Sequence, residues 1–192
     1  MKKLLTLSLA VGFAGMASAV SMQWGSASAI KFDGSNLKSD ATVTGYLIAL
    51  DSFVDKYKVT DSFSAVDIGT KVDEKNKTTT LSKITNTWTI DTTSYGNGDT
   101  FAVLLKYTGA SDGKTYWNLS SGLLTMVGMD DGSGDTPPND ANAVSAAFSF
   151  AKGTDGTLTA GGGWVAAAAV PEPGIACMAL LGIGMMIKRR RA

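Results

Sequence analysis

The residue types that most often carry catalysis are scarce in this chain. It contains no histidine, and its single cysteine is Cys177, close to the C-terminus. Serine–histidine–aspartate and cysteine–histidine mechanisms therefore have no general base, and zinc sites built from histidine or cysteine and structural disulfides are excluded as well. Any chemistry in the body of the protein would have to rest on carboxylates.

Carboxylates are abundant, and the densest group lies in one loop rich in glycine and serine. Asp130, Asp131 and Asp135 lie close together there, and Asp140 follows shortly after. Ca²⁺ requires several hard oxygen ligands on a flexible loop, so these residues form a candidate calcium site. The spacing does not match an EF-hand loop, and the bidentate glutamate is missing. The simpler interpretation is a solvated turn between strands, and we expect no other cofactor.

A pair of carboxylates could also support glycoside hydrolysis. That reaction needs the two groups at about 5 Å, or at about 6.5–9.5 Å, across a cleft. With 15 aspartates between residues 20 and 170, some pair reaches this spacing by chance, and no pair stands out. We therefore favour a non-enzymatic body over a glycosidase that works with carboxylates alone.

Aromatic residues offer a second kind of site, because an aromatic face supplies apolar area beside a polar rim, as sugars require. The candidates are Trp24, Trp88, Trp117, Trp164, Tyr46, Tyr95, Tyr107 and Tyr116. We expect Trp88 and Trp164 in the core. Tyr116 and Trp117 are consecutive and should point to opposite faces of a strand, so one of them is expected to be exposed. Such an aromatic, together with the loop 130–135, would make the body a carbohydrate-binding module, with calcium as its metal.

The charge distribution excludes nucleic acid as a partner. The chain as a whole has a net charge of zero, but residues 20–170 contain 11 lysines, no arginine and 16 acidic residues, which gives −5. An acidic body without arginine cannot neutralise a run of phosphates or read base edges with guanidinium groups. Asn76 and Asn118 begin Asn-x-Ser/Thr triplets, but two such triplets are expected by chance in a chain this rich in serine and threonine.

The elements that must position these residues are expected to be strands. From Val20 onward, clusters of serine, threonine, glycine and aspartate separate short apolar or alternating runs. We predict an all-β fold, an antiparallel β-sandwich or flattened barrel of about 8–10 strands. The expected strands cover 28–32, 42–50, 85–93, 100–108, 115–120, 123–129, 144–150 and 157–160.

The connections between these strands are less uniform. Asn97 and Gly98 predict a hairpin that joins 85–93 to 100–108, within a meander of four strands that continues to residue 129. The polar run 73–77 is interpreted as a solvated loop. Between residues 51 and 83 two interpretations remain open, because Asp51 could cap a short helix or 56–60 and 78–84 could be strands.

The N-terminus has the order of a secretory signal peptide. Lys2 and Lys3 precede an apolar run over 4–15, and Ala17 and Ala19 frame the small-residue site that signal peptidase reads. We expect cleavage before Val20. The alternative, a buried first helix, does not explain the order of basic, apolar and small residues.

The C-terminus forms a separate unit. We divide the chain into a signal peptide (1–19), a β-rich exported domain (20–165), a linker (166–170) and a tail (171–192). The tail begins with Pro171, Glu172 and Pro173, and an uncharged segment over 174–187 follows. As a helix this segment measures about 21 Å, which is short against a hydrocarbon core of about 30 Å. The chain then closes with the basic residues Lys188, Arg189, Arg190 and Arg191, which favour a cytoplasmic C-terminus.

This arrangement of motif, short apolar helix and basic cluster resembles the PEP-CTERM sorting signal. The resemblance is confined to the tail. It implies that Pro171, Glu172 and Pro173 are the motif read by an exosortase, a membrane enzyme that removes the tail. It also implies export through an inner-membrane intermediate to the cell surface or extracellular matrix of a Gram-negative-type bacterium that makes extracellular polysaccharide. The expected partners are signal peptidase, an exosortase-type enzyme, the membrane and that polysaccharide.

Overall fold

The computed structural model describes residues 20–37, 41–78, 83–128 and 141–169. Within these ranges every regular element is a strand, except for one turn of 3-10 helix, η1 (Ala65–Asp67). The strands form mainly antiparallel sheets, so the predicted all-β class is confirmed. The described ranges contain 13 strands, more than the expected 8–10, because six of them are only two residues long.

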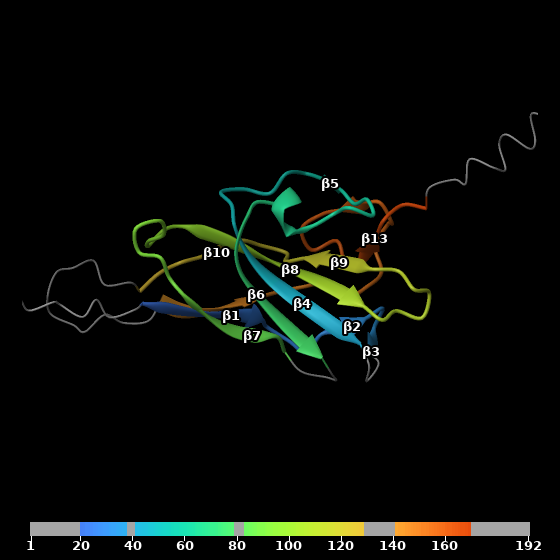
Figure 1. Ribbon diagram of the computed structural model, residues 1–192, viewed down its shortest axis with the longest axis horizontal. Helices are drawn as coiled ribbons and strands as arrows, with labels where there is room; N and C mark the ends of the chain where they lie inside the picture. Colours follow the sequence, from blue (N-terminus) through green and yellow to red (C-terminus); the bar gives the residue numbers. More distant parts are fainter. Residues whose placement is uncertain (1–19, 38–40, 79–82, 129–140, 170–192) are drawn as a thin grey trace, which may run out of the picture.

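The larger sheet is built around β8 (Thr100–Thr108) (Figure 1). In spatial order its strands are β13 (Val165–Ala166), β9 (Tyr116–Leu119), β8, β4 (Thr42–Ala49) and β6 (Thr70–Thr78), all antiparallel to their neighbours. Short β10 (Leu124–Thr125) also pairs with β8. Because β4 occupies the whole of one edge of β8, β9 and β10 follow one another along the other edge.

Both faces of this sheet are buried, which explains the unbroken apolar run in β8. Phe101 and Val103 point into an inner core, whereas Ala102 and Leu104 point into an outer core on the opposite face. A strand that is buried on both sides has no need for the polar alternation of a half-exposed strand.

The inner core is shared with a second sheet of three strands. Its central strand is β1 (Ser21–Ser26), which lies between β11 (Ala141–Ala146) and β7 (Thr85–Thr89). Met22 and Trp24 of β1 and Trp88 of β7 belong to the same hydrophobic cluster as the inner face of the larger sheet. The pairing of β1 with β11 is parallel, which differs from the purely antiparallel arrangement that we expected.

The outer core is covered by irregular chain. The segment that contains β5 (Tyr57–Lys58) and η1 crosses this face, and β5 pairs with β12 (Thr157–Leu158) (Figure 1). At η1, the Asp67 carboxylate accepts hydrogen bonds from the Ser64 backbone N–H at 2.7 Å and from the Ser64 hydroxyl at 3.2 Å. The alternative of a helix capped by Asp51 is wrong, because residues 51–56 are irregular and lead directly into β5.

A small hairpin completes the described chain. It joins β2 (Lys31–Phe32) to β3 (Ser35–Asn36) through Asp33 and Gly34, whose φ angles are 49° and 74°. Residues 28–32 are thus only partly a strand. The true first strand, β1, lies upstream of the one that we predicted.

Three predictions about the connections are wrong. Asn97 and Gly98 do form a turn, but β7 pairs with β1 in the smaller sheet, so the chain crosses between sheets here instead of forming a hairpin. The meander also fails, because β10 pairs with β8 and not with β9. Residues 73–77 are not a loop, since they lie in the edge strand β6.

The body continues beyond the predicted boundary at residue 165. Ala166 pairs with Tyr116 of β9 and is buried, so the expected linker 166–170 begins inside the sheet. The chain leaves at one end of the long axis, and β1 begins near the other end (Figure 1). None of the helices in the described ranges has the length and apolar character that a membrane span requires.

Candidate functional site

Most of the residues that the sequence singled out lie outside the described ranges. These are Ala17, Ala19, Asp130, Asp131, Asp135, Asp140, Pro171, Glu172, Pro173, Lys188, Arg189, Arg190 and Arg191. The structure therefore does not test the calcium loop, the signal-cleavage site or the sorting motif. In the part of the chain that it does describe, no three acidic, histidine or cysteine side chains are grouped so that they could hold a metal ion.

The aromatic residues serve mainly as core. All four tryptophans are at most 8 % exposed, as are Tyr107 and Tyr116. The prediction for Trp88 and Trp164 is confirmed. The prediction that Tyr116 or Trp117 is exposed is wrong. They do point to opposite faces, but the inner core buries Tyr116 and the outer core buries Trp117.

The two Asn-x-Ser/Thr triplets differ in accessibility. Asn118 is fully buried, and its Nδ2 donates a hydrogen bond to the Ser149 carbonyl at 2.6 Å, so a glycan cannot be attached in the folded chain. Asn76 is exposed on β6, where its Oδ1 accepts a hydrogen bond from Thr44.

A concave site lies among the described residues on the outer face, beside the point where the chain leaves the sheet. It is a cavity of about 440 Å³, which we call the terminal hollow. The segment that covers the outer core contributes Thr60, Asp61 and Phe63 to its lining. The end of the described chain contributes Ala166, Ala167, Ala168 and Ala169. Lys106, Gly113, Lys114, Thr115 and Trp117 complete the lining.

The strand residues of the hollow owe their positions to the register of β8 with β9. Lys106 pairs with Trp117, and both side chains point to the outer face because they alternate with the inner-facing Leu105 and Tyr116. The Lys106 ammonium lies 5.4 Å from the centroid of the Trp117 ring, and Phe63 meets the same ring edge-on at 5.1 Å. The wall of the hollow therefore contains an ammonium group, that of Lys106, held against the aromatic ring of Trp117.

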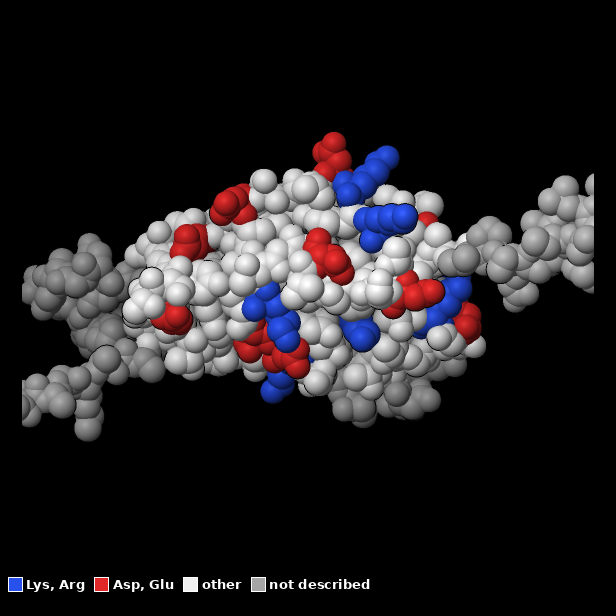
Figure 2. Space-filling view, turned by 45° about the horizontal axis from the view of Figure 1, so that its top comes forward, with Lys and Arg blue, Asp and Glu red and all other residues white. Residues whose placement is uncertain are grey.

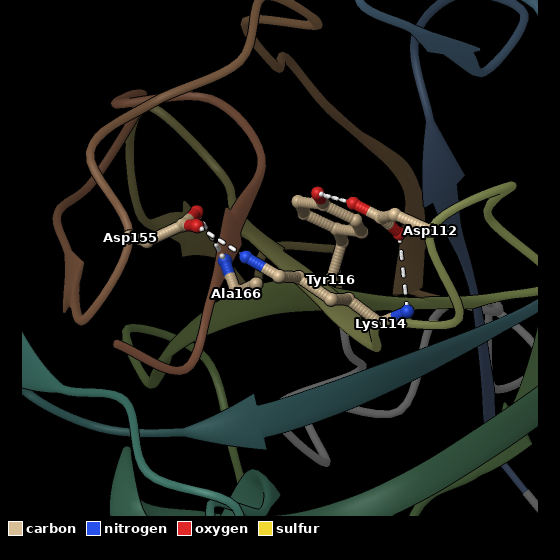
Figure 3. Close-up of polar contacts among 5 residues, drawn as sticks. All are labelled: Asp112, Lys114, Tyr116, Asp155 and Ala166. Carbon is tan, nitrogen blue, oxygen red and sulfur yellow. Dashed lines mark hydrogen bonds and ion pairs between the residues drawn. The ribbon is translucent and has the colours of Figure 1, made fainter. Parts of the chain in front are cut away.

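A second cation is held at the hollow by Asp155 (Figure 3). The Lys114 ammonium donates to one carboxylate oxygen of Asp155 at 3.0 Å, and the other oxygen accepts the Ala166 N–H at 3.2 Å. Partial burial acts to raise the pKa of Asp155, but the hydrogen bonds from Lys114 and Ala166 outweigh it, so the pKa lies below its usual value. The same bond to Asp155 raises the pKa of Lys114.

Asp112 lies on the other side of Lys114 (Figure 3). It accepts a hydrogen bond from the Tyr116 hydroxyl at 2.6 Å and one from the Lys114 backbone N–H at 3.1 Å, and these bonds lower its pKa. Burial, followed by the bond to Asp112, raises the pKa of Tyr116. Two ionised carboxylates thus hold the turn before β9 and the strand β13 in place.

These carboxylates are not suited to acid catalysis. A glycosidase needs a carboxylic acid whose pKa is raised so that it stays protonated near neutral pH. Asp112 and Asp155 have lowered pKa values and hydrogen-bond partners that favour the charged form. The arrangement can bind and orient a ligand, but these two groups do not supply a proton donor.

Sequence reasoning missed this site. Lys114 and Asp155 are 41 positions apart, and each lies in a turn that resembles ordinary solvated chain. The one signal that could have indicated the site is Lys106, a charged residue within the apolar run of β8.

Comparison with known proteins adds no relative. No family model matches the chain, and searches of curated proteins and of solved structures return no match either.

Proposed function

We propose that this protein is exported and held at the membrane by its C-terminal tail, and that an exosortase-type enzyme then removes the tail and releases it to the cell surface or extracellular matrix. The observation that carries the proposal is the order of signals at the two ends of the chain. A basic, apolar and small-residue leader precedes Val20, and Pro171, Glu172 and Pro173 precede an apolar segment and a basic cluster.

The body supports this proposal at its N-terminal end. The Val20 carbonyl accepts a hydrogen bond from the Ile90 N–H at 2.8 Å, and β1 begins at the next residue. Cleavage after Ala19 would therefore leave the first strand and its pairing intact.

The place where the described chain ends also supports the sorting proposal. The described chain ends at Ala169 at one end of the long axis, with β1 starting near the opposite end (Figure 1). A body tethered through its tail would then extend away from the membrane.

The body itself acts as a structural or binding domain in this proposal. We interpret its two sheets as a β-sandwich whose stability comes from the inner and outer cores, without disulfides. The edge strand β6 is protected by charged residues, including Lys71, Glu74 and Lys75, which discourages pairing with other chains outside the cell.

The intact mass of the protein isolated from its native host tests the sorting proposal. We expect a mature species that begins at Val20 and lacks residues 188–191. A variant with Pro171→Ala, Glu172→Ala and Pro173→Ala should retain the tail. The matched control is Pro137→Ala with Pro138→Ala, which alters two prolines outside the motif and should be processed normally. A wild-type mature species that still carries residues 188–191 would contradict tail removal and leave a simple membrane anchor.

A carbohydrate-binding body is the second candidate function. The observation that favours it is the terminal hollow, in which lysine and threonine side chains lie beside Trp117 and Phe63. Among the described residues, the lining of the hollow includes one acidic side chain, that of Asp61.

A further inference from the structure

We propose that the terminal hollow binds an acidic polysaccharide, with a sugar carboxylate held between Lys106 and Lys114. This inference deepens the second candidate function and is independent of whether the tail is processed. The cavity of about 440 Å³ falls within the range of about 300–1,000 Å³ that is usual for small-molecule sites. The charged residues of its lining are Lys106, Lys114 and Asp61. Because Lys114 already pairs with Asp155, the attraction for an anion comes mainly from Lys106.

The charges of the surrounding surface differ between the two ends. The half of the molecule where β13 lies carries lysines interspersed with acidic side chains, and the opposite end of the same face shows only acidic side chains (Figure 2). A polyanion is therefore repelled less strongly at the half that carries lysines than at the opposite end.

Both lysines are positioned before a ligand arrives. Asp155 orients the Lys114 ammonium, and the packing of Lys106 over Trp117 restricts its side chain. An ammonium has three donors, so the bond to Asp155 leaves Lys114 able to donate to a ligand carboxylate. Binding therefore costs little side-chain entropy.

The rest of the lining fits a sugar better than a peptide. Trp117 and Phe63 are almost buried and line the hollow only with the small part of their surface that stays exposed. The Thr60 and Thr115 hydroxyls can exchange hydrogen bonds with sugar hydroxyls. A peptide that bound by adding a strand would instead need an open strand edge. The outer edge of β13 is already occupied, because Gly153 and Gly156 donate hydrogen bonds to the carbonyls of Trp164 and Ala166.

Calorimetric titration of the full chain with a short galacturonate oligomer tests the proposal. We expect binding that weakens as salt is added, and binding of an uncharged galactose oligomer of equal length that is at least about tenfold weaker. Lys106→Gln should weaken galacturonate binding by about three- to fivefold, and Lys106→Arg should restore it. Asp61→Asn should strengthen binding, because it removes the one negative charge in the lining.

Lys75→Gln on the exposed edge strand β6 is the matched control, since it makes the same charge change away from the hollow, and it should leave binding unchanged. Lys114→Gln should also weaken binding, and circular dichroism must then show that the fold survives the loss of the bond to Asp155. The proposal is overturned if galacturonate does not bind, if the galactose oligomer binds equally well, or if Lys75→Gln weakens binding as much as Lys106→Gln. Equal binding of a polyglutamate peptide would assign the hollow to acidic peptides instead.

Discussion

Asp73 shows how one side chain can join the two sheets. It lies on β6 of the larger sheet, and its Oδ2 accepts hydrogen bonds from Trp24 Nε1 at 2.7 Å and from Asn86 Nδ2 at 2.8 Å. Trp24 and Asn86 belong to β1 and β7 of the smaller sheet. The side chain of the next residue, Glu74, is exposed and forms an ion pair with exposed Lys71 at 2.9 Å. Two adjacent acidic residues thus differ completely in what they stabilise.

Replacing Asp73 should destabilise the fold, whereas replacing its neighbour should not. In Asp73→Ala the indole N–H of Trp24, a residue only 2 % exposed, loses its acceptor. We expect the free energy of unfolding to fall by about 1–3 kcal/mol. Glu74→Ala removes an exposed ion pair and should cost less than about 1 kcal/mol. Urea denaturation followed by tryptophan fluorescence measures both, and equal losses would show that Asp73 does not connect the sheets.

At the scale of elements, the sequence predicts the strands that have strong local patterns. β4 and β8 were expected within a residue of where they lie, because their runs of β-branched, aromatic and aliphatic residues suit a buried strand. The burial of Trp88 and Trp164 follows from the same reasoning.

The remaining elements depend on contacts that local patterns do not contain. β6 was interpreted as a loop because its residues are mostly charged, yet an edge strand tolerates charge on its solvent side. The parallel pairing of β1 with β11 joins segments far apart in the chain. The terminal hollow was not predictable for the same reason, since Lys106, Asp61 and Ala168 meet only after the sheet has formed.

The contact between β1 and β7 depends on a glycine. A Cβ at Gly25 would lie 2.0 Å from the Ile84 carbonyl oxygen, which accepts a hydrogen bond from the Ser26 N–H. Gly25→Ala should therefore force the strands apart and lower the free energy of unfolding by about 1–3 kcal/mol or more. Gly96→Ala is the control, because no atom lies within 4 Å of its added Cβ, and its effect should stay within about 0.5 kcal/mol. Thermal unfolding of the two variants makes the comparison, and a Gly25→Ala midpoint equal to the control would refute the close approach.

At the scale of the whole molecule, the body lacks the two side-chain types whose ordinary pKa values lie closest to neutral pH. Residues 20–169 contain no histidine and no cysteine. The lowered pKa values of Asp112 and Asp155 give stability that is present above the unfolded value near pH 4 and is lost as pH falls through the lower folded value. The raised pKa of Lys114 gives stability that is present below about pH 10 and is lost as pH rises through the folded value. Tyr116 acts in the same alkaline range, because the unfolded chain releases its phenolic proton first.

We therefore expect the free energy of unfolding to be nearly constant between about pH 5 and pH 9 and to fall on both sides. Denaturant titrations at a series of pH values measure this profile. A step between about pH 6 and pH 8 would contradict it, because no side chain of the body has an ordinary pKa in that range. Asp155→Asn should reduce the loss of unfolding free energy on the acid side, which would show that Asp155 contributes to that loss.

The central position of β1 also sets the order in which the chain can fold. β1 is the first strand to be synthesised, but Trp24 pairs with Val144, about 120 residues later. Closing so large a loop is slow, because the chain loses its entropy before the new contacts repay it. A chain truncated before residue 141 should accordingly show weaker hydrogen-exchange protection at the amides of β1 than the full chain, because β7 alone remains as its partner. Nearly the whole body must therefore have left the ribosome before the first strand can gain both of its neighbours. If the chain is exported as proposed, its topology alone then delays completion of the smaller sheet until most of the body has crossed the membrane.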